Sequence, residues 1–434
     1  MNNKLQKYNS YKSSGVEWLG DIPEHWEVIR LKNIIRANIT DGPHETPVFI
    51  GEGIPFLSVD GIQEGELVFE NCRYISMKDF IKYKKKCNIE KYDILMGKAA
   101  SIGKIAQSKV DFEYSIWSPL ALIKPLLSKI NSTFLEFYLK SSYSQYQIEI
   151  LCTSNTQKNI SMGDIPKIIS TLPPLNEQTA IAKFLDDKTA KIDQAITIKK
   201  NQIELLKERK LSLINKAVTK GINPNVKLKP SGVEWIGEIP EHWQVKRLKY
   251  VFQILKRISG ELGHSVLSIT QKGIKVKDTE SGTGQLSMDY SKYQFVYKGD
   301  FAMNHMDLLT GYVDISKYDG VISPDYRVFD LIEPNSSKEY MLLLLQLCYS
   351  NKVFYAHGQG VSMLGRWRFP SENFNIFPFP VPPKSEQIEI ADFIAKTNKK
   401  IAKAISLKEK EIEKLKEYKA SLINSAVTGK VKVF

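Results

Sequence analysis

The densest run of basic residues outside residues 172–221 and 381–430 is Lys82-Tyr83-Lys84-Lys85-Lys86, which carries an aromatic ring at its second position. Ammonium groups spaced in this way can contact phosphates, and each contact adds salt-dependent affinity for a nucleic acid. A charge run is also typical of a solvated edge that binds nothing. The sequence leaves both interpretations open.

Two tripeptides that lie 209 residues apart carry side chains able to read DNA bases: Gln157-Lys158-Asn159 and Arg366-Trp367-Arg368. Glutamine and asparagine can pair with adenine, and arginine with guanine, through two hydrogen bonds in the major groove. The alternative is a loop that only docks its domain on a helix. Four further candidates for nucleic-acid contacts follow the ends of presumed strands: Lys98, Lys104, Asn304 and His305.

Some residues resemble a metal site or a docking site. Asp41, His44 and Glu45 are of metal-ligand types, but the glycine and prolines among them favour a turn-rich structural loop. His25 and His242 each precede a tryptophan, which favours packing or docking over catalysis. Exposed aromatic side chains are frequent hot spots for partner proteins, although core packing is the more ordinary role. The docking candidates are Trp18, Trp26, Trp235 and Trp243.

Catalytic motifs are missing where they would be expected. The proline pairs in LPPL (172–175) and VPPK (381–384) lack the preceding Asn or Asp of the Asn/Asp-Pro-Pro-aromatic methyltransferase motif. There is no GxxxxGK[ST] loop for ATP, and no Gly-rich loop after a strand suggests S-adenosylmethionine binding. No arrangement typical of a nuclease or a catalytic triad stands out. We therefore expect a chain without catalysis and without a metal or cofactor of its own.

Length and charge limit what these candidates can do. With 434 residues, 42% of them apolar, the chain is long enough for several folded domains. The net charge of +13 is uneven: residues 33–171 carry +1, residues 250–380 carry 0, and residues 172–221 and 381–430 carry +4 each. The two large regions can therefore offer a DNA-binding face only by clustering basic side chains on one side.

The cysteines and the apolar runs indicate the cellular compartment in which the protein is expected. Cys72, Cys87, Cys152 and Cys348 form no close pair and no CxxC motif, which argues against a disulfide framework or a zinc knuckle. The first residues lack the apolar core of a signal peptide, and the longest apolar run, 341–345, is too short to span a bilayer. We expect a soluble, cytoplasmic protein.

A cassette occurs twice in the sequence. Residues 14–32 read SGVEWLGDIPEHWEVIRLK and residues 231–249 read SGVEWIGEIPEHWQVKRLK, with 15 of 19 positions identical, which indicates a duplication. Each cassette is followed by a large region, 33–171 or 250–380. The two regions have diverged, yet both contain short β-rich runs bounded by Gly, Asp and Pro, which predicts one mixed α/β fold for both. Shorter helices are expected near 133–148 and 338–349.

A long helix is also repeated, at 176–219 and 385–428. Apolar residues recur at spacings of three, four and seven, which places them on one side of a helix. At about 1.5 Å per residue each helix would be roughly 65 Å long. The seam residues are Leu185, Ile192, Ile196, Ile203, Leu206, Leu213 and Ala217 in the first copy, and Ile394, Ile401, Ile405, Ile412, Leu415, Leu422 and Ala426 in the second.

The ends of these helices carry the expected signals. A proline pair precedes each helix and blocks its extension, and Asn176 and Ser385 are candidate N-caps. Glu177 and Glu386 lie where the helix dipole favours an acid. A glycine, Gly221 or Gly429, marks each exit.

These patterns predict an α+β fold. Two similar mixed α/β domains are separated by two long helices, which form an antiparallel intramolecular coiled coil with cyclic pseudo-two-fold symmetry. The expected order is a cassette (1–32), a domain (33–171), a helix (172–221), the repeated cassette (222–249), a second domain (250–380) and a second helix (381–434). The C-terminus then lies near the N-terminus. Pairing between two chains is the alternative.

The chain resembles the specificity (S) subunit of type I restriction-modification systems over essentially its full length. The resemblance rests on the WLGDIPEHW and WIGEIPEHW cassettes, DGPHETP at 41–47, LPPLNEQ at 172–178 and the two long helices, in that order. It implies two target-recognition domains, each reading half of a split site in double-stranded DNA. The helices would hold the domains apart and dock two methyltransferase (modification) subunits, with restriction subunits in the larger complex.

The resemblance also implies that S-adenosylmethionine and ATP with Mg²⁺ bind to those partner subunits. The second half departs from the pattern, since it has VPPKSEQ at 381–387 and no equivalent of DGPHETP, so the two domains are expected to read different half-sites. Two other hypotheses stay open on the sequence: a coiled-coil adaptor that binds proteins but not DNA, and an enzyme whose diverged active site lies in 33–171 or 250–380.

Overall fold

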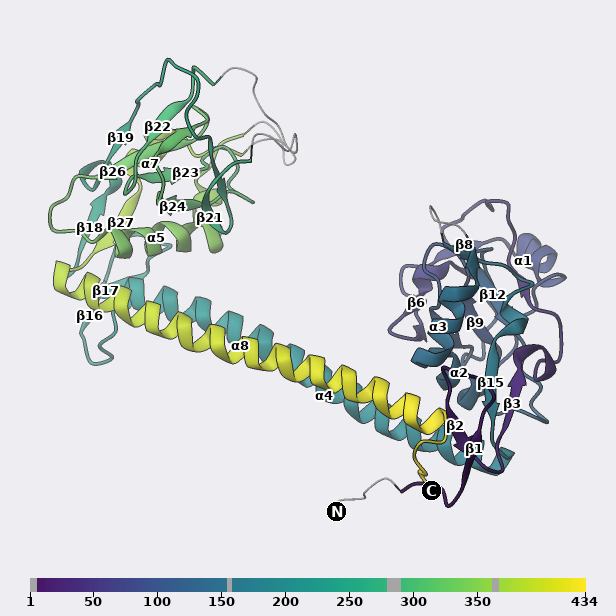
Figure 1. Cartoon of the computed structure of the whole chain (residues 1–434). Coiled ribbons are helices and arrows are strands. Elements are labelled where there is room, and N and C mark those ends of the chain that lie inside the picture. Colours follow the sequence, from purple (N-terminus) through teal and green to yellow (C-terminus); the bar gives the residue numbers. More distant parts are fainter. Residues whose placement is uncertain (1–5, 154–157, 279–289, 361–366) are drawn as a thin grey trace. The chain divides into compact units, whose positions relative to one another are not determined.

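The computed structural model of the chain describes residues 6–153, 158–278, 290–360 and 367–434. The chain divides into two compact units (Figure 1). Unit 1 consists of Met1–Lys200 and Glu409–Phe434, and unit 2 of Asn201–Lys408. Among the described residues no helix is long and apolar enough to cross a membrane.

Unit 1 is a mixed α/β unit with short strands. Its strands are β1 (Tyr11–Ser13), β2 (Asp21–Pro23), β3 (Glu27–Arg30), β4 (Thr40–Asp41), β5 (Ile54–Leu57), β6 (Ile62–Gln63), β7 (Glu66–Leu67), β8 (Arg73–Ile75), β9 (Ile94–Gly97), β10 (Ile105–Gln107), β11 (Ser115–Ile116), β12 (Leu120–Ile123), β13 (Cys152–Thr153), β14 (Asn159–Ile160) and β15 (Ile169–Leu172). Its short helices are α1 (Met77–Lys84), α2 (Ser132–Lys140) and α3 (Ser142–Leu151). The helix expected near 133–148 is thus two helices, because Ser141 turns to an extended conformation and caps α3.

Unit 2 has the same character. Its strands are β16 (Leu228–Pro230), β17 (Glu238–Pro240), β18 (Gln244–Arg247), β19 (Phe252–Leu255), β20 (Leu267–Thr270), β21 (Gly273–Val276), β22 (Gln294–Val296), β23 (Phe301–Met303), β24 (Val313–Ile315), β25 (Gly320–Ile322), β26 (Arg327–Leu331) and β27 (Pro378–Val381). Its short helices are α5 (Lys338–Ser350), α6 (Val353–Ala356) and α7 (Ser371–Ile376).

Each unit is built around an antiparallel four-stranded sheet. The strand order is β10-β9-β12-β4 in unit 1 and β24-β23-β26-β19 in unit 2, so equivalent strands occupy equivalent places. The registers agree as well. Met96 of β9 pairs with Ala121 of β12, and Met303, which corresponds to Met96, pairs with Arg327 of β26. The predicted common mixed α/β fold is confirmed. The central strands β9 and β12 are buried along their whole length, as their apolar residues require.

The cassettes form small sheets that lead into the long helices. In unit 1, β1 pairs with β2, and β3 pairs with β15, the strand directly before the first long helix. In unit 2, β16 pairs with β17, and β18 pairs with β27 in the same way. Identical cassette residues therefore produce the same local structure twice.

The two long helices are α4 (Leu175–Lys220) and α8 (Lys384–Val427), within one residue of the predicted bounds. The division between the units falls inside both. The first helical carbonyl acceptors belong to Pro174 and Pro383, so Asn176 and Ser385 lie inside the first turn and the prediction that they cap the helices is wrong. Gly221 and Gly429 follow the helices with φ of +75° and +72°, as the exit prediction requires.

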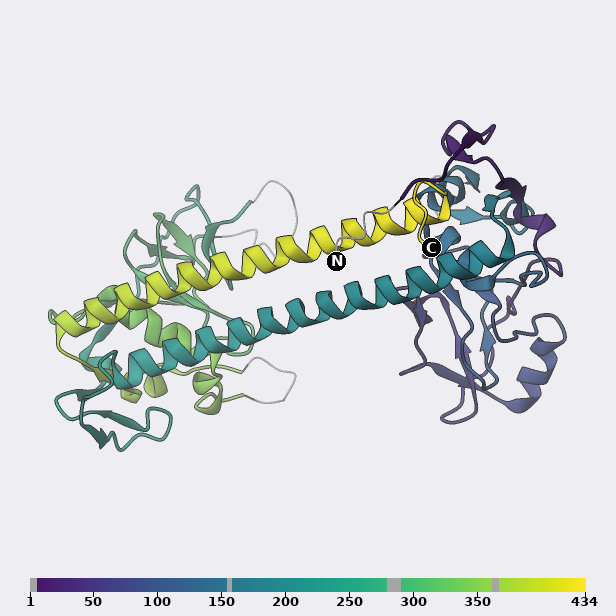
Figure 2. The ribbon, with the colours of Figure 1, turned by 90° about the horizontal axis from the view of Figure 1, so that it is seen from below.

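The helices pair within the chain, and the pairing is antiparallel. In unit 1, Lys199 lies 2.6 Å from Glu411, and Asp193 lies 2.6 Å from Lys419, so one residue number falls as the other rises. Figures 1 and 2 show this segment of α8 beside α4. In unit 2, the end of α4 and the start of α8 contribute to one core cluster. The predicted intramolecular partner is confirmed.

The predicted seam residues lie between the paired helices or against a unit core. Most are buried: Leu185, Ile192, Ile196, Ile203, Ala217, Ile394, Ile401, Ile412, Leu422 and Ala426. The other four are half-buried: Leu206, Leu213, Ile405 and Leu415. The ends of the chain meet in unit 1, where Gln6 forms a β-bridge with Lys432, as the antiparallel pairing predicts.

Candidate nucleic-acid interface

A repeated junction fixes each domain to the long helices. In unit 1, Glu177 in the first turn of α4 accepts hydrogen bonds from Trp26 Nε1 (3.0 Å) and lies 2.7 Å from His25 Nε2. In unit 2, Glu386 of α8 accepts from Trp243 Nε1 (3.0 Å), and its carboxylate lies 2.6 Å from the neighbouring histidine, His242. In each unit the glutamate therefore binds the cassette, in addition to the favourable position at the helix dipole that the sequence predicts.

The next residue of each helix holds the domain. Gln178 Oε1 accepts from the backbone N–H of Asn131, which caps α2, at 2.7 Å. Gln387 Oε1 accepts from the backbone N–H of Ser337, which caps α5, also at 2.7 Å. Both glutamines are fully buried. The Glu-Gln pair thus binds a cassette with one side chain and a domain helix with the next.

The tryptophans of the cassettes serve mainly as packing residues. Trp26 and Trp243 are 0% and 1% exposed, so their rings offer no surface to a partner, and docking through them is not supported. Trp18 is half-buried beside Tyr143 (ring centroids 6.3 Å apart), and half-buried Trp235 stacks on Phe377 (5.7 Å).

The basic run predicted to contact phosphates lies on α1 and the turn after it. Three of its lysines are paired with carboxylates: Lys82 with Glu45, Lys84 with Glu113, and Lys86 with Asp41. Lys85 is exposed and has no acidic partner among the described residues. Exposed ion pairs contribute little stability, so phosphates can compete for these lysines, but the run is less free than its sequence suggests.

Asp41 is the centre of a basic cluster at the end of β4. Its carboxylate is buried, and Lys86 (2.5 Å), Lys98 (3.3 Å) and His44 (3.1 Å) lie around it. Burial would raise the pKa of Asp41, but the hydrogen bonds and charges of the two lysines outweigh it and lower that pKa. Two lysines therefore share one carboxylate, which leaves an excess of positive charge at this place.

The structure brings the two separate groups of sequence candidates together, and it does so in both units. The backbone N–H of Ile160, next to Asn159, donates to the carbonyl of Lys98 (3.0 Å). The backbone N–H of Phe369, next to Arg368, donates to the carbonyl of His305 (2.8 Å). A strand-end loop and the segment before the last strand thus form one surface, which we call the strand-end surface.

The other candidates that the structure describes lie on or near this surface. Lys158 and Asn159 are exposed, and Lys158 pairs with Glu149 at 2.9 Å. Lys104 is half-buried and points its ammonium group to the carbonyl of Val59. The side chain of Asn304 accepts from the backbone of its own turn, which occupies its oxygen. Gln157 and Arg366 lie outside the described residues.

Arg327 is a residue of unit 2 that the sequence did not single out. It is the first residue of β26 and only 4% exposed. Burial lowers its pKa to about 10. Burial, together with the charges of Arg327 and Arg368, lowers the pKa of His305 to about 4. A charged residue within the apolar run Tyr326-Arg327-Val328-Phe329 was the available signal.

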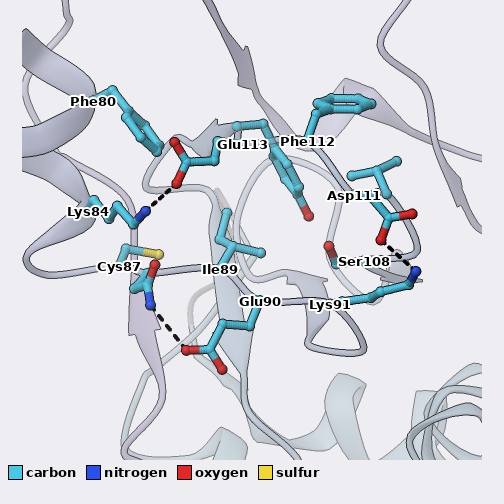
Figure 3. A pocket seen from close by; sticks show the side chains of 13 residues that line it. Phe80, Lys84, Cys87, Ile89, Glu90, Lys91, Ser108, Asp111, Phe112 and Glu113 are labelled. Carbon is cyan, nitrogen blue, oxygen red and sulfur yellow. Dashed lines mark hydrogen bonds and ion pairs between the residues drawn. The ribbon is translucent and has the colours of Figure 1, made fainter. Parts of the chain in front are cut away.

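A pocket of about 200 Å³ in unit 1 has mixed chemistry (Figure 3). Phe80, Ile89 and Phe112 line it, and the ion pairs Lys84–Glu113 and Lys91–Asp111 stand at its sides. Burial raises the pKa of Cys87 to about 11, so this lining thiol is not an activated nucleophile. Its lysines are neutralised, and we assign no anion to this pocket. Among the described residues no group of three His, Cys, Asp or Glu side chains is arranged to hold a metal.

Comparisons with known proteins agree with this architecture. The family model of the type I restriction modification DNA specificity domain matches residues 23–207 and 240–417. The putative type I restriction enzyme MjaX specificity subunit of Methanocaldococcus jannaschii is 28% identical over 99% of this chain and 99% of its own length. The type I restriction enzyme MjaVIII specificity subunit of the same organism is 28% identical over 95% of this chain and 94% of its own.

A solved structure supports the fold. A chain from a study of complex assembly and conformational transition of the type I R-M system has a TM-score of 0.67 and 12% identity, covering 94% of this chain and 99% of that one.

Proposed function

The chain belongs to the type I restriction modification DNA specificity family, and we propose that it reads a split DNA target with one half-site for each mixed α/β domain. The domains that read DNA are residues 33–171 and 250–380. Residues 172–221 and 381–434 contain the paired helices, and the cassettes, within 1–32 and 222–249, attach the helices to the domains.

One contrast carries the proposal. The junction residues are the same in both units, namely a tryptophan, a histidine, a glutamate and a glutamine in equivalent contacts. The strand-end surfaces share a backbone hydrogen bond but differ in side chains: Lys98 and Asn159 in unit 1 stand where unit 2 has His305 and Arg368. A reader of two different half-sites needs a constant frame and variable base contacts.

The proposed chemistry of the complex belongs to other subunits. We assign no catalytic residue to this chain, and methyl transfer and cleavage would be carried out by two methyltransferase subunits and by restriction subunits. S-adenosylmethionine and ATP with Mg²⁺ would bind to those subunits. The half-buried rings of Trp18 and Trp235 are the candidates that we favour for docking a methyltransferase subunit, since Trp26 and Trp243 are buried.

The proposal is tested by co-expressing the chain with its methyltransferase and mapping methylated adenines by sequencing. We expect methylation within one split sequence with a fixed gap. Methylation at unsplit or random sites would refute the two-domain reader. A coiled-coil adaptor would give no sequence-dependent methylation at all.

A matched pair of variants assigns the half-sites. Asn159→Ala and Arg368→Ala remove exposed side chains at equivalent positions, so neither is expected to disturb folding. Each should relax one half-site only, by about 1–3 kcal/mol of discrimination, if its side chain makes a bidentate base contact. Relaxation of the same half-site by both variants would contradict the assignment of one domain to one half-site.

A further inference from the structure

Unit 2 contains a small pocket whose described lining residues include no acidic side chain. It has a volume of about 210 Å³ and lies beside β19 and the start of β26. Among its lining residues, Arg327 and Lys256 are cationic, and Gln294, His305 and Ser371 are polar. The pocket of Figure 3, in unit 1, differs in this respect because carboxylates stand among its lysines. The charge of the unit 2 pocket therefore favours an anion.

Arg327 is the buried cation of this pocket, and its guanidinium group is only partly used. Nη2 donates to the carbonyl of Phe369 (2.8 Å) and to Ser371 Oγ (3.2 Å). Nη1 is buried without a hydrogen-bond partner among the described residues, and no carboxylate there forms an ion pair with the group. The guanidinium group also lies over the ring of Phe374, 4.8 Å from its centroid, but an aromatic ring carries no net charge. A buried charge without a counter-ion is costly, so its presence points to a ligand that supplies the missing negative charge.

His305 is the second unsatisfied group. Its Nδ1 is buried without a hydrogen-bond partner among the described residues. Because burial and the charges of Arg327 and Arg368 hold its pKa low, the ring is neutral and carries one N–H, for which an oxyanion competes with the backbone of Met303. A neutral donor beside two guanidinium groups suits an oxyanion, since no proton has to be lost or gained on binding.

Lys256 stands at the exposed side of the pocket. It has no acidic partner among the described residues, so its ammonium group is available to a ligand. The equivalent place in unit 1 is organised differently. There Lys98 corresponds to His305 and shares the carboxylate of Asp41 with Lys86, and Ala121 corresponds to Arg327. The acid-free pocket is thus a property of unit 2 and not of the shared fold.

We propose that this pocket binds one phosphate oxyanion, with Arg327, His305 and Lys256 as its ligands. If unit 2 reads a half-site as proposed above, on which this assignment rests, the oxyanion is a phosphodiester group of that DNA half-site. Phosphate contacts of this kind position a protein on DNA without reading a base. The alternative is that Arg327 only braces β26 against the segment 369–371.

The first experiment uses inorganic phosphate as the probe. Thermal unfolding of the full chain is measured against phosphate concentration, with chloride at matched ionic strength as the reference. We expect a saturable stabilisation of the wild type that weakens severalfold in Lys256→Gln and His305→Gln and disappears in Arg327→Met. Lys229→Gln removes the same charge from an exposed lysine in β16 of the same unit, outside every candidate contact, and should behave as the wild type.

Arg327 also holds Phe369, so its replacement is expected to lower stability even without phosphate. Lys256 is exposed, so Lys256→Gln is expected to fold normally, and its response to phosphate is not confounded by a loss of stability. If phosphate stabilises the wild type no more than chloride does, Arg327 is only a brace and the proposal is overturned. Equal stabilisation of the wild type and of Lys256→Gln would overturn it as well.

The second experiment separates the two sources of phosphate. Affinity for a duplex containing the mapped target is measured between 50 and 200 mM salt. Loss of one phosphate contact should reduce the salt dependence of Lys256→Gln by about one ion, or about 3.5-fold over this range. Phosphate binding with an unchanged salt slope would overturn the assignment to DNA in favour of free phosphate. Phosphate binding by a chain that binds no DNA would refute the proposed function and leave the phosphate pocket standing.

Discussion

The two junction glutamates provide a comparison within one chain, because Glu177→Gln and Glu386→Gln make the same chemical change in two settings. Glu177 is 12% exposed and accepts from Trp26, His25 and also Tyr8 (3.3 Å). Glu386 is 35% exposed and has only the tryptophan and histidine contacts among the described residues. Glutamine keeps one oxygen but replaces the other with an amide donor, which faces a donor of the cassette.

The magnitude follows from the contacts. A hydrogen bond to a charged group contributes about 1.5–3 kcal/mol, and a buried donor left without an acceptor adds a desolvation cost. We expect Glu177→Gln to lower the free energy of opening its cassette by about 2–4 kcal/mol. We expect about 1–2 kcal/mol for Glu386→Gln, because water can reach the more exposed carboxylate and replace part of the loss.

Amide hydrogen exchange of the full chain, followed by mass spectrometry, measures each cassette separately. Each 1.4 kcal/mol appears as a tenfold faster exchange in peptides from 8–30 or 225–247. Glu17→Gln, an exposed cassette position without a side-chain partner among the described residues, is the control and should change nothing. Equal acceleration by both variants would show that burial and the extra tyrosine donor do not set the cost.

Three further predictions concern charge, connectivity and modularity. The pKa of His305 is about 4 in the folded chain and 6.5 in the unfolded chain, so the unfolded state binds the extra proton and stability is lost as the pH falls from about 6.5 to 4. His305→Gln should remove up to about 3 kcal/mol of that loss. Urea unfolding at pH 7 and at pH 4.5 measures the difference. A chain opened near Asn223 and joined from Phe434 to Met1 should keep its target; normal folding without assembly would contradict the antiparallel junctions. Exchange of residues 250–380 for the equivalent domain of a relative should alter one half-site in methylation mapping, and alteration of both would refute modularity.

The parts of the fold that repeat were predictable from the sequence. The long helices and their seam were recognisable because period and duplication agree, and both are local properties. The break at Ser141 was missed because a serine within a helical pattern does not reveal its extended conformation. The predicted caps lay two residues too far along the chain, since the prolines themselves supply the first carbonyls.

The candidate site was only partly predictable. Lys98 and Asn159 were found as separate candidates, but their meeting depends on strand pairing that no local pattern encodes. Glu177 was assigned to the helix dipole because its partner Trp26 lies 151 residues away in the chain. Arg327 was overlooked because its neighbours form an ordinary strand, and only the buried surroundings make its charge unusual.

The division of the chain has a consequence for the order of folding during synthesis. Unit 2 is one continuous segment, Asn201–Lys408, so all of its residues leave the ribosome before unit 1 is complete. Unit 1 begins first but lacks Glu409–Phe434, including Gly429, which packs on Trp26. The domain translated first is therefore the one completed last. A nascent chain stalled before residue 409 would carry a complete second unit and a first unit with an open apolar face, the form on which a chaperone or protease would act.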